Sequence, residues 1–261
     1  MMIILIKKLI ICLTLIYPIC NGNNPNKLID SVKVHDIKTF PFIVSIQLRN
    51  HHICAGSIIG PRHILTAAKC ISFGDKYKFL GNLKVLARTT DIFTLSSGLL
   101  YDVKHTVFHP HYSTIGTGEN DIAILILENS IGFSAKSYPI KLQKNRIHDR
   151  SLVLNVGWGG TRNPMRGPAK KLHLLDMQLA NKFDCQHAFN GFFVNHNYQS
   201  CAYGINPFSG VAMGDGGNPL IYNNKIAGIT TLFKPQSPRF IVYIKIWKYA
   251  DWIQETIDLY L

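Results

Sequence analysis

Short apolar stretches alternate with turn-forming residues along most of the chain. Four of these stretches, residues 41–48, 123–127, 152–156 and 225–231, predict β-strands, because each is bounded by Gly, Pro or Asn. Helical periodicity is scarce between them. Short strands that recur with turn signals are typical of β-sandwiches and β-barrels. The pattern therefore predicts an all-β fold.

Apolar residues recur at helical spacing only near the C-terminus. On a helix this spacing would place apolar and charged residues on opposite faces. We therefore expect the chain to end in an amphipathic α-helix. The apolar positions are Ile246, Tyr249, Ala250, Ile253 and Ile257, and the charged positions are Lys248, Asp251, Glu255 and Asp258.

The first 22 residues have the pattern of a secretory signal peptide. Lys7 and Lys8 precede a short apolar run, and the small residues Cys20 and Gly22 suit cleavage by signal peptidase. A membrane-spanning helix needs about 20 uninterrupted apolar residues, and the lysine pair interrupts this stretch. A retained anchor is the alternative. We expect a signal peptide at residues 1–22, a pro-segment or N-terminal extension at 23–28, and one folded domain at 29–261 of a secreted, extracellular protein without a membrane span.

The chain of 261 residues is basic, with a formal net charge of +13, which falls to +11 without the two signal-peptide lysines. Lysine and arginine concentrate in residues 141–150 and 162–171. A basic extracellular surface suggests sulfated glycans, anionic membranes or acidic proteins as partners. Solvated loops without a partner are the alternative. Nucleic acid is not expected, because export removes the usual target and no recognition motif is present.

Four cysteines follow the predicted signal peptide: Cys54, Cys70, Cys185 and Cys201. An even number of cysteines in a secreted chain predicts disulfides. Their spacing favours the pairs Cys54–Cys70 and Cys185–Cys201. A zinc site is the alternative, but the C-x-x-C spacing typical of zinc ligands is missing.

Histidines gather at positions 105, 109 and 111, with His51 and His52 elsewhere. A metal site would need a fixed set of ligands supported by further hydrogen bonds. We expect exposed loop histidines instead. The chain is expected to hold no metal and no cofactor.

Residues 214–219, Gly-Asp-Gly-Gly-Asn-Pro, resemble the G-D-S-G-G-P segment of trypsin-like serine proteases (peptidase family S1). Further segments resemble this family in the same order along the chain. The resemblance implies two six-stranded antiparallel β-barrels followed by a C-terminal α-helix. The segments are 52–59 (HICAGSII), 64–70 (ILTAAKC), 120–125 (NDIAIL), 156–159 (VGWG), 228–233 (GITTLF) and 242–253 (VYIKIWKYADWI).

Catalysis in this family uses a serine, a histidine that takes its proton and an aspartate that orients the histidine. On the matching positions, Asp121 is the aspartate, Lys69 stands at the histidine and Gly216 stands at the serine. Glycine has no side chain, so no acyl-enzyme can form through it. Lys69 could act as a base, or form a structural ion pair with Asp121. The resemblance therefore implies that the chain is not a protease of the family's mechanism.

The substrate pocket also departs from the family pattern. Gly210 stands where trypsin-like members carry the aspartate that selects Lys or Arg. Leu232 and Phe233 replace the tryptophan and glycine of the pocket wall. We expect Phe233 to fill the primary pocket.

In active family members a new N-terminal amine pairs with the aspartate that Asp215 matches. The residues aligned with that terminus, 29–32, read Ile-Asp-Ser-Val, so that burying the terminus would bring a second carboxylate toward the site. Either Asp215 finds another cation, or this region has a zymogen-like arrangement.

Replaced triad positions on an otherwise intact scaffold also resemble the inactivated paralogues of the group 3 mite allergen proteases. This resemblance implies a secreted pseudoprotease that acts by protein binding, as a decoy or inhibitor of a host proteolytic cascade such as complement, in immune evasion. One alternative is a hydrolase with a displaced nucleophile such as Ser209 or Thr230. Another is a scaffold that modulates an active protease.

Overall fold

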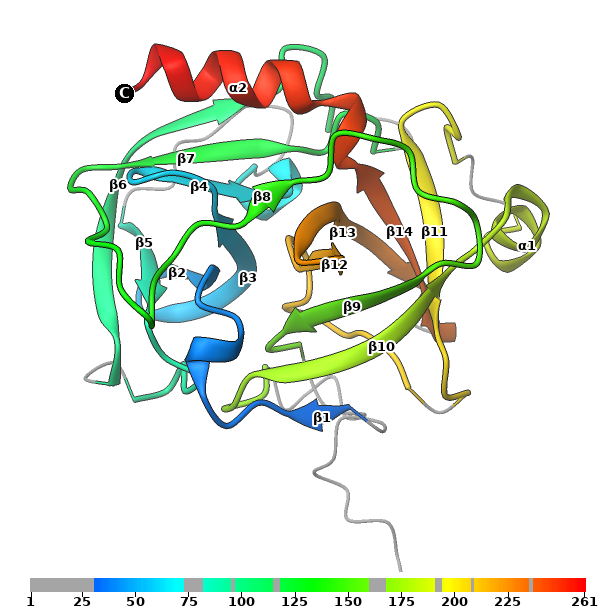
Figure 1. Cartoon of the computed structure of the whole chain (residues 1–261), viewed down its shortest axis with the longest axis horizontal. Coiled ribbons are helices and arrows are strands. Elements are labelled where there is room, and N and C mark those ends of the chain that lie inside the picture. Colours follow the sequence, from blue (N-terminus) through cyan, green and yellow to red (C-terminus); the bar gives the residue numbers. More distant parts are fainter. Residues whose placement is uncertain are drawn as a thin grey trace, which may run out of the picture.

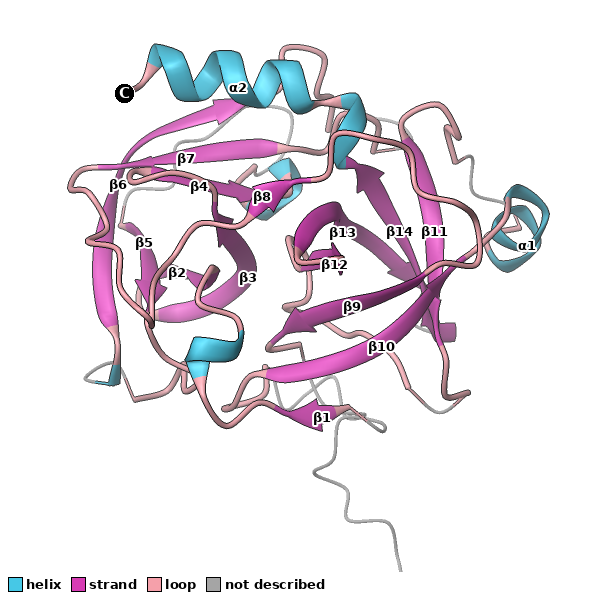
Figure 2. Cartoon of the chain, viewed as in Figure 1, coloured by secondary structure: helices cyan, strands magenta, loops and turns pink. Residues whose placement is uncertain are grey.

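A computed structural model describes residues 31–72, 82–94, 97–114, 118–159, 168–190, 194–207, 209–234 and 237–261 (Figure 1). The predicted signal peptide and the segment 23–28 lie outside these residues. Figure 2 shows the strands in two groups joined by long loops, with the longer helices at the edge of the molecule. Within the described ranges, no helix is long and apolar enough to cross a membrane.

The first half of the chain forms a closed antiparallel barrel. Its last strand in sequence, β7, is buried along its whole length and pairs with β4 on one side and β6 on the other. The barrel order is β2 (Ile43–Leu48), β3 (His51–Ile58), β4 (His63–Thr66), β7 (Ala123–Leu127), β6 (Leu99–Phe108) and β5 (Leu83–Ala87).

The second half forms another barrel, which the pairing of β9 with β10 closes. The short strand β1 (Val32–Lys33) extends the sheet beside β10, and β8 (Lys141–Leu142) pairs in parallel with β13. The barrel order is β9 (Leu152–Gly157), β10 (His173–Leu179), β11 (Gln199–Gly204), β14 (Ser237–Lys245), β13 (Lys225–Lys234) and β12 (Pro219–Tyr222).

The predicted C-terminal helix is α2 (Ala250–Leu259), which follows the 3₁₀ helix η5 (Ile246–Lys248). The buried Ile253 belongs to the core that contains the first barrel, and Ile257 packs against that core, so α2 crosses from the second barrel back to the first (Figure 1). The predictions of two six-stranded antiparallel barrels and a C-terminal helix are confirmed. The other helical segments are η1 (Ile37–Thr39), η2 (Ala68–Cys70) and α1 (Lys182–Ala188).

Two disulfides attach short helical segments to the barrels. Cys70 of η2 is bonded to Cys54 of β3, with 6.0 Å between their Cα atoms. Cys185 of α1 is bonded to Cys201 of β11, with 5.4 Å between their Cα atoms. These are the pairs that the cysteine spacing favours, and both bonds lie in buried surroundings.

Removal of the Cys185–Cys201 bond tests how far it stabilises the fold. The bond spans 16 positions of sequence, for which loop-closure entropy gives about 3 kcal/mol. The Cys185→Ala/Cys201→Ala variant should therefore lose about 3 kcal/mol of unfolding free energy in urea titrations. Under reducing conditions wild type and variant should unfold at nearly the same urea concentration. A difference that persists in reductant would assign the loss to packing and not to the cross-link.

Candidate functional site

The residues that match the triad come from three elements at the junction of the barrels. Lys69 lies in η2 after β4, Asp121 lies two residues before β7, and Gly216 lies in the loop before β12. The Gly216 carbonyl accepts a hydrogen bond of 2.9 Å from Ala55 N–H of β3, in the first barrel. The next residue, Gly217, donates its N–H to Thr230 O of β13 at 2.9 Å, in the second barrel. The loop thus joins the two barrels at this point.

Asp121 is 1% exposed and touches Lys69 through the main chain. The Lys69 backbone N–H donates to Asp121 Oδ1 at 2.7 Å. Burial raises the pKa of Asp121 to about 6, although the Lys69 charge and the backbone N–H groups of Lys69 and Ala68 act in the opposite direction. The structure therefore brings Lys69 and Asp121 together.

The side chain of Lys69 does not form the expected ion pair. Among the described residues the ion pairs involve other lysines, and Asp121 takes part in none of them. Burial lowers the pKa of the half-buried Lys69, while the nearby Asp121 charge raises it. The Lys69–Asp121 pair is thus not among the ion pairs of the described residues, and the direct contact that the structure shows is the bond from the Lys69 backbone amide to Asp121 Oδ1.

Gly216 passes close to the Cys54–Cys70 disulfide. A Cβ atom on Gly216 would lie 3.0 Å from both sulfur atoms, a tight contact. As glycine, residue 216 presents only backbone to this junction. It supplies neither a hydroxyl nor a thiol.

Asp215, one residue earlier, is 4% exposed and is surrounded by neutral donors. Its Oδ1 accepts from Gly159 N–H at 2.8 Å and from Asn218 Nδ2 at 2.7 Å, and its Oδ2 accepts from Ala212 N–H at 2.9 Å. Burial raises the pKa of Asp215 to about 6, against the effect of these three hydrogen bonds. None of the ion pairs in the described part of the chain includes Asp215. Another cation, one of the two alternatives for Asp215, is therefore not paired with it among the described residues, and amide donors satisfy the carboxylate.

Asn218 and Asn155 extend this network, and sequence reasoning missed both. Asn218 Nδ2 also donates to Asn155 Oδ1 at 2.9 Å, and Asn155 Nδ2 donates to Thr230 Oγ1 at 2.8 Å. All three side chains are at most 3% exposed. The signal was present in the sequence, because Asn218 stands where the family segment has its last glycine.

His52 is a fixed part of this site and not an exposed loop residue, which corrects the expectation for that histidine. Its Nε2 donates to Gly214 O at 3.0 Å, and its Nδ1 accepts from the Ser45 hydroxyl at 2.8 Å. The ring also packs edge-on against Trp158. Burial lowers the pKa of His52 to about 4, so the imidazole is neutral at physiological pH. The neutral His52 ring therefore holds Gly214 by donating this hydrogen bond. The φ of Gly214 is +98°, a conformation that glycine adopts readily.

The residues expected to close the primary pocket lie close to the second barrel's core. A Cβ on Gly210 would come within 2.8 Å of the Pro238 backbone, so this position has no room for a longer side chain without a shift. Leu232 and Phe233 lie beside irregularities in the pairing of β13 with β14, and both are half-buried. Phe233 packs against the core cluster that contains Val211. That these residues close the pocket stays a prediction.

The described residues contain no group of three or more His, Cys, Asp or Glu side chains that could hold a metal ion. His109, from the histidine-rich stretch, instead packs its ring against Tyr249 and Trp252. What this site offers chemically is a set of backbone and amide donors and the buried carboxylates of Asp121 and Asp215.

Replacement of Asp215 tests the buried carboxylate. Its pKa is raised from 3.8 to about 6 in the folded protein, so the charged form costs free energy that protonation relieves as the pH falls below 6. In Asp215→Asn this cost disappears. The stability of the variant relative to wild type should therefore increase by on the order of 3 kcal/mol between pH 4 and pH 7.

Urea titrations at pH 4, 5, 6 and 7 would measure this difference. The comparison must be between variant and wild type, because the lowered pKa of His52 changes the stability of both with pH in the opposite direction. The exposed Asp176→Asn is the matched control and should show no such trend. Parallel pH profiles for Asp215→Asn and wild type would contradict the assigned burial cost.

Comparison with known proteins agrees with this architecture. A model of the trypsin family matches residues 29–253. A trypsin of Phaedon cochleariae is 29% identical over 244 residues, which cover 90% of this chain and 91% of that protein. A vitellin-degrading protease of Bombyx mori is 26% identical over 264 residues, which cover 96% of this chain and 95% of that protein.

Solved structures show the same fold. The mouse brain serine protease neuropsin superposes with a TM-score of 0.75 at 22% identity, covering 87% of this chain and 99% of its own. The human heparin binding protein superposes with a TM-score of 0.73 at 19% identity, covering 88% and 96%. At these identities the likeness concerns the fold alone. Since the family model spans most of the chain, the protein belongs to the trypsin-like serine protease family, peptidase family S1.

Proposed function

We propose that this protein is a secreted, non-catalytic member of the trypsin-like family that acts by binding other molecules. The observation that carries the proposal is Gly216, which stands at the family's nucleophile position and has no side chain. The mechanism of the family begins with attack by a serine hydroxyl, so this position cannot start the reaction. The proposed mature protein lacks residues 1–22.

Lys69 does not rescue catalysis in this proposal. The lowered pKa of Lys69 makes it a better base than an exposed lysine. A general base acts only when a hydroxyl or thiol lies within hydrogen-bond reach. Residue 216 provides neither, so the base has no nucleophile to activate.

A displaced nucleophile finds little support. Ser209 is 2% exposed and its hydroxyl donates to Asn206 O at 2.6 Å. Thr230 is 1% exposed and its hydroxyl accepts from Asn155. Both hydroxyls are buried and already serve structural hydrogen bonds. The hydrolase alternative would need one of them to reach a substrate.

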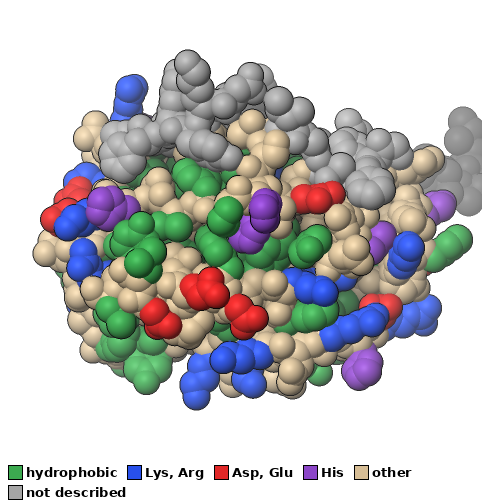
Figure 3. Space-filling model, turned by 90° about the horizontal axis from the view of Figure 1, so that it is seen from above, with side chains coloured by type: hydrophobic (Ala, Val, Ile, Leu, Met, Phe, Trp, Pro, Cys, Tyr) green, Lys and Arg blue, Asp and Glu red, His purple; other side chains and the backbone are tan. Residues whose placement is uncertain are grey.

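In this proposal, partners bind to the outer surface of the protein and not at the junction of the two barrels. Figure 3 shows basic side chains at several separate places on the face that carries α2. Residues 141–150 contribute exposed cations, including Lys144 and Arg146. Such a surface suits an acidic extracellular protein, or a sulfated glycan or other anionic surface.

The protein partner that we propose is a component of a host proteolytic cascade such as complement. A protein with the family's fold but without its nucleophile could occupy the place of an active protease without cleaving the substrate. The resemblance to inactivated paralogues of the group 3 mite allergen proteases supports this decoy role, with immune evasion as its purpose. A scaffold that presents an active protease to its substrate remains the alternative role.

A fluorophosphonate probe tests the absence of a nucleophile. The wild-type protein should remain unlabelled, because no activated hydroxyl faces the junction. The Gly216→Ser/Lys69→His variant should be labelled, with a rate on the order of 100-fold or more above wild type. The Lys69→His variant alone is the matched control and should stay unlabelled. Labelling of the wild type that maps to Ser209 or Thr230 would establish the displaced-nucleophile alternative.

Addition of the purified protein to serum tests the decoy role. Deposition of cascade products on an activating surface should fall as the concentration of the protein rises, because the decoy competes with an active protease. The disulfide-reduced, unfolded protein serves as control and should have no effect. Unchanged deposition would contradict inhibition, and increased deposition would favour the scaffold role.

A further inference from the structure

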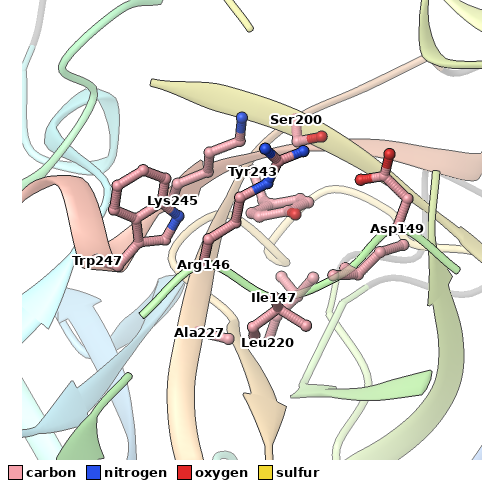
Figure 4. A pocket seen from close by; sticks show the side chains of 10 residues that line it. Arg146, Ile147, Asp149, Ser200, Leu220, Ala227, Tyr243, Lys245 and Trp247 are labelled. Carbon is pink, nitrogen blue, oxygen red and sulfur yellow. The ribbon is translucent and has the colours of Figure 1, made fainter. Parts of the chain in front are cut away.

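One end of the second barrel holds a small pocket that the triad positions do not touch (Figure 4). Its interior leaves about 30 Å³ for the centres of water-sized molecules, so it can take one small group. The loop between β8 and β9 forms one wall, and the strands of the second barrel form the other. The residues that the argument uses are Arg146, Asp149, Ser200, Tyr243, Lys245 and Trp247.

The loop that carries Arg146 is held against the second barrel by packing and hydrogen bonds. Ile147 packs against the apolar core cluster of the second barrel. Arg150 N–H donates to Leu179 O at 2.9 Å, and Gln178 Nε2 donates to Arg150 O at 2.9 Å. These contacts place Arg146 beside the pocket, so its guanidinium and the Lys245 ammonium share one opening (Figure 4).

The charges in the pocket are unbalanced. Burial lowers the pKa of Lys245, and the positive charges of Arg146 and Lys248 lower it further, while Asp149 alone raises it. Among the described residues neither Arg146 nor Lys245 belongs to an ion pair. Arg146 and Lys245 outnumber Asp149, the one acid of the lining, and their charges repel each other, so a bound anion would relieve this repulsion.

Hydrogen-bond donors complete the site. Lys245 Nζ donates one of its three hydrogens to His196 O at 2.6 Å, which fixes the ammonium and leaves two hydrogens for a ligand. Burial raises the pKa of Tyr243, so its phenol stays protonated. The Ser200 hydroxyl lies in the same lining. The Ser200 and Tyr243 side chains are hydrogen-bonded to each other, so the guanidinium and the ammonium are the main donors to a tetrahedral oxyanion.

We propose that this pocket binds a sulfate ester of a sulfated glycan. Trp247 in the lining, whose ring has the Lys248 ammonium 4.5 Å from its centroid, offers further apolar surface for a sugar ring. The exposed Lys182 and Lys248 lie near enough to influence the pKa values of His196 and Lys245, so further sulfates along the same chain would meet further cations. The site itself stands on its geometry, and only the extracellular source of the ligand rests on the proposed function.

Titration of the full secreted protein with a sulfated glycosaminoglycan hexasaccharide tests the proposal, with tryptophan fluorescence and calorimetry as readouts. Arg146→Gln and Lys245→Gln should each weaken binding about tenfold or more, because each removes a charged hydrogen bond. Lys104→Gln is the matched control. It removes one exposed charge from β6 of the first barrel and should change binding by less than about twofold. Arg146 is exposed, so its variant should fold even if Lys245→Gln does not.

Further arms separate the possible sources of the anion. Inorganic sulfate should compete with the hexasaccharide at millimolar concentration, and the unsulfated hexasaccharide should not bind. An equal loss of affinity in Lys104→Gln and Arg146→Gln would overturn the pocket in favour of diffuse charge attraction. Arg146-dependent binding to phosphatidylserine vesicles, with none to the hexasaccharide, would overturn the glycan, as would the absence of any binding. None of these results depends on whether the protein is catalytic.

Discussion

The buried carboxylate of Asp215 is the interaction on which the junction of the two barrels depends. It collects hydrogen bonds from Gly159, Ala212 and Asn218, all of them neutral donors. These bonds hold the loop whose Gly216 carbonyl reaches the first barrel. An unpaired buried carboxylate is costly, and three hydrogen bonds reduce that cost without a cation. The order of this loop therefore rests on amide groups supplied by the folded domain itself.

Around this centre the two-barrel scaffold of the trypsin-like family is retained. The Cys54–Cys70 disulfide and His52 hold the same loop from its other sides, through the close approach to Gly216 and the hydrogen bond to Gly214. Rigid support of a loop is useful to a catalyst, but it serves a binding protein equally well, because a preorganised surface loses little entropy on association. The proposed function and the proposed anion pocket both draw on this rigidity, at two separate places on the second barrel.

The strands and the C-terminal helix could be predicted from the sequence because each depends on the local pattern of apolar and polar residues. Residues 123–127 are a short, continuous apolar run, and in the structure they form β7, buried along its whole length. The relation of Lys69 to Asp121 could not be read in this way. Their positions follow from the family resemblance, but whether an ammonium or a backbone amide reaches the carboxylate depends on a difference of a few ångströms. The hydrogen bond of His52 could likewise not be predicted from the sequence, since its partner Gly214 is 162 positions away.

By itself the sequence determined the family, the two barrels, the cysteine pairing that spacing favours and the absence of a side chain at residue 216, because each follows from residue identity and local order. Only the tertiary structure decided which donors satisfy Asp215 and which charges share a pocket with Lys245. Asn155 meets Asn218 across 63 positions, and Lys245 meets His196 across 49. Contacts of this kind are created when the barrel closes, and no local pattern of apolar and polar residues encodes them.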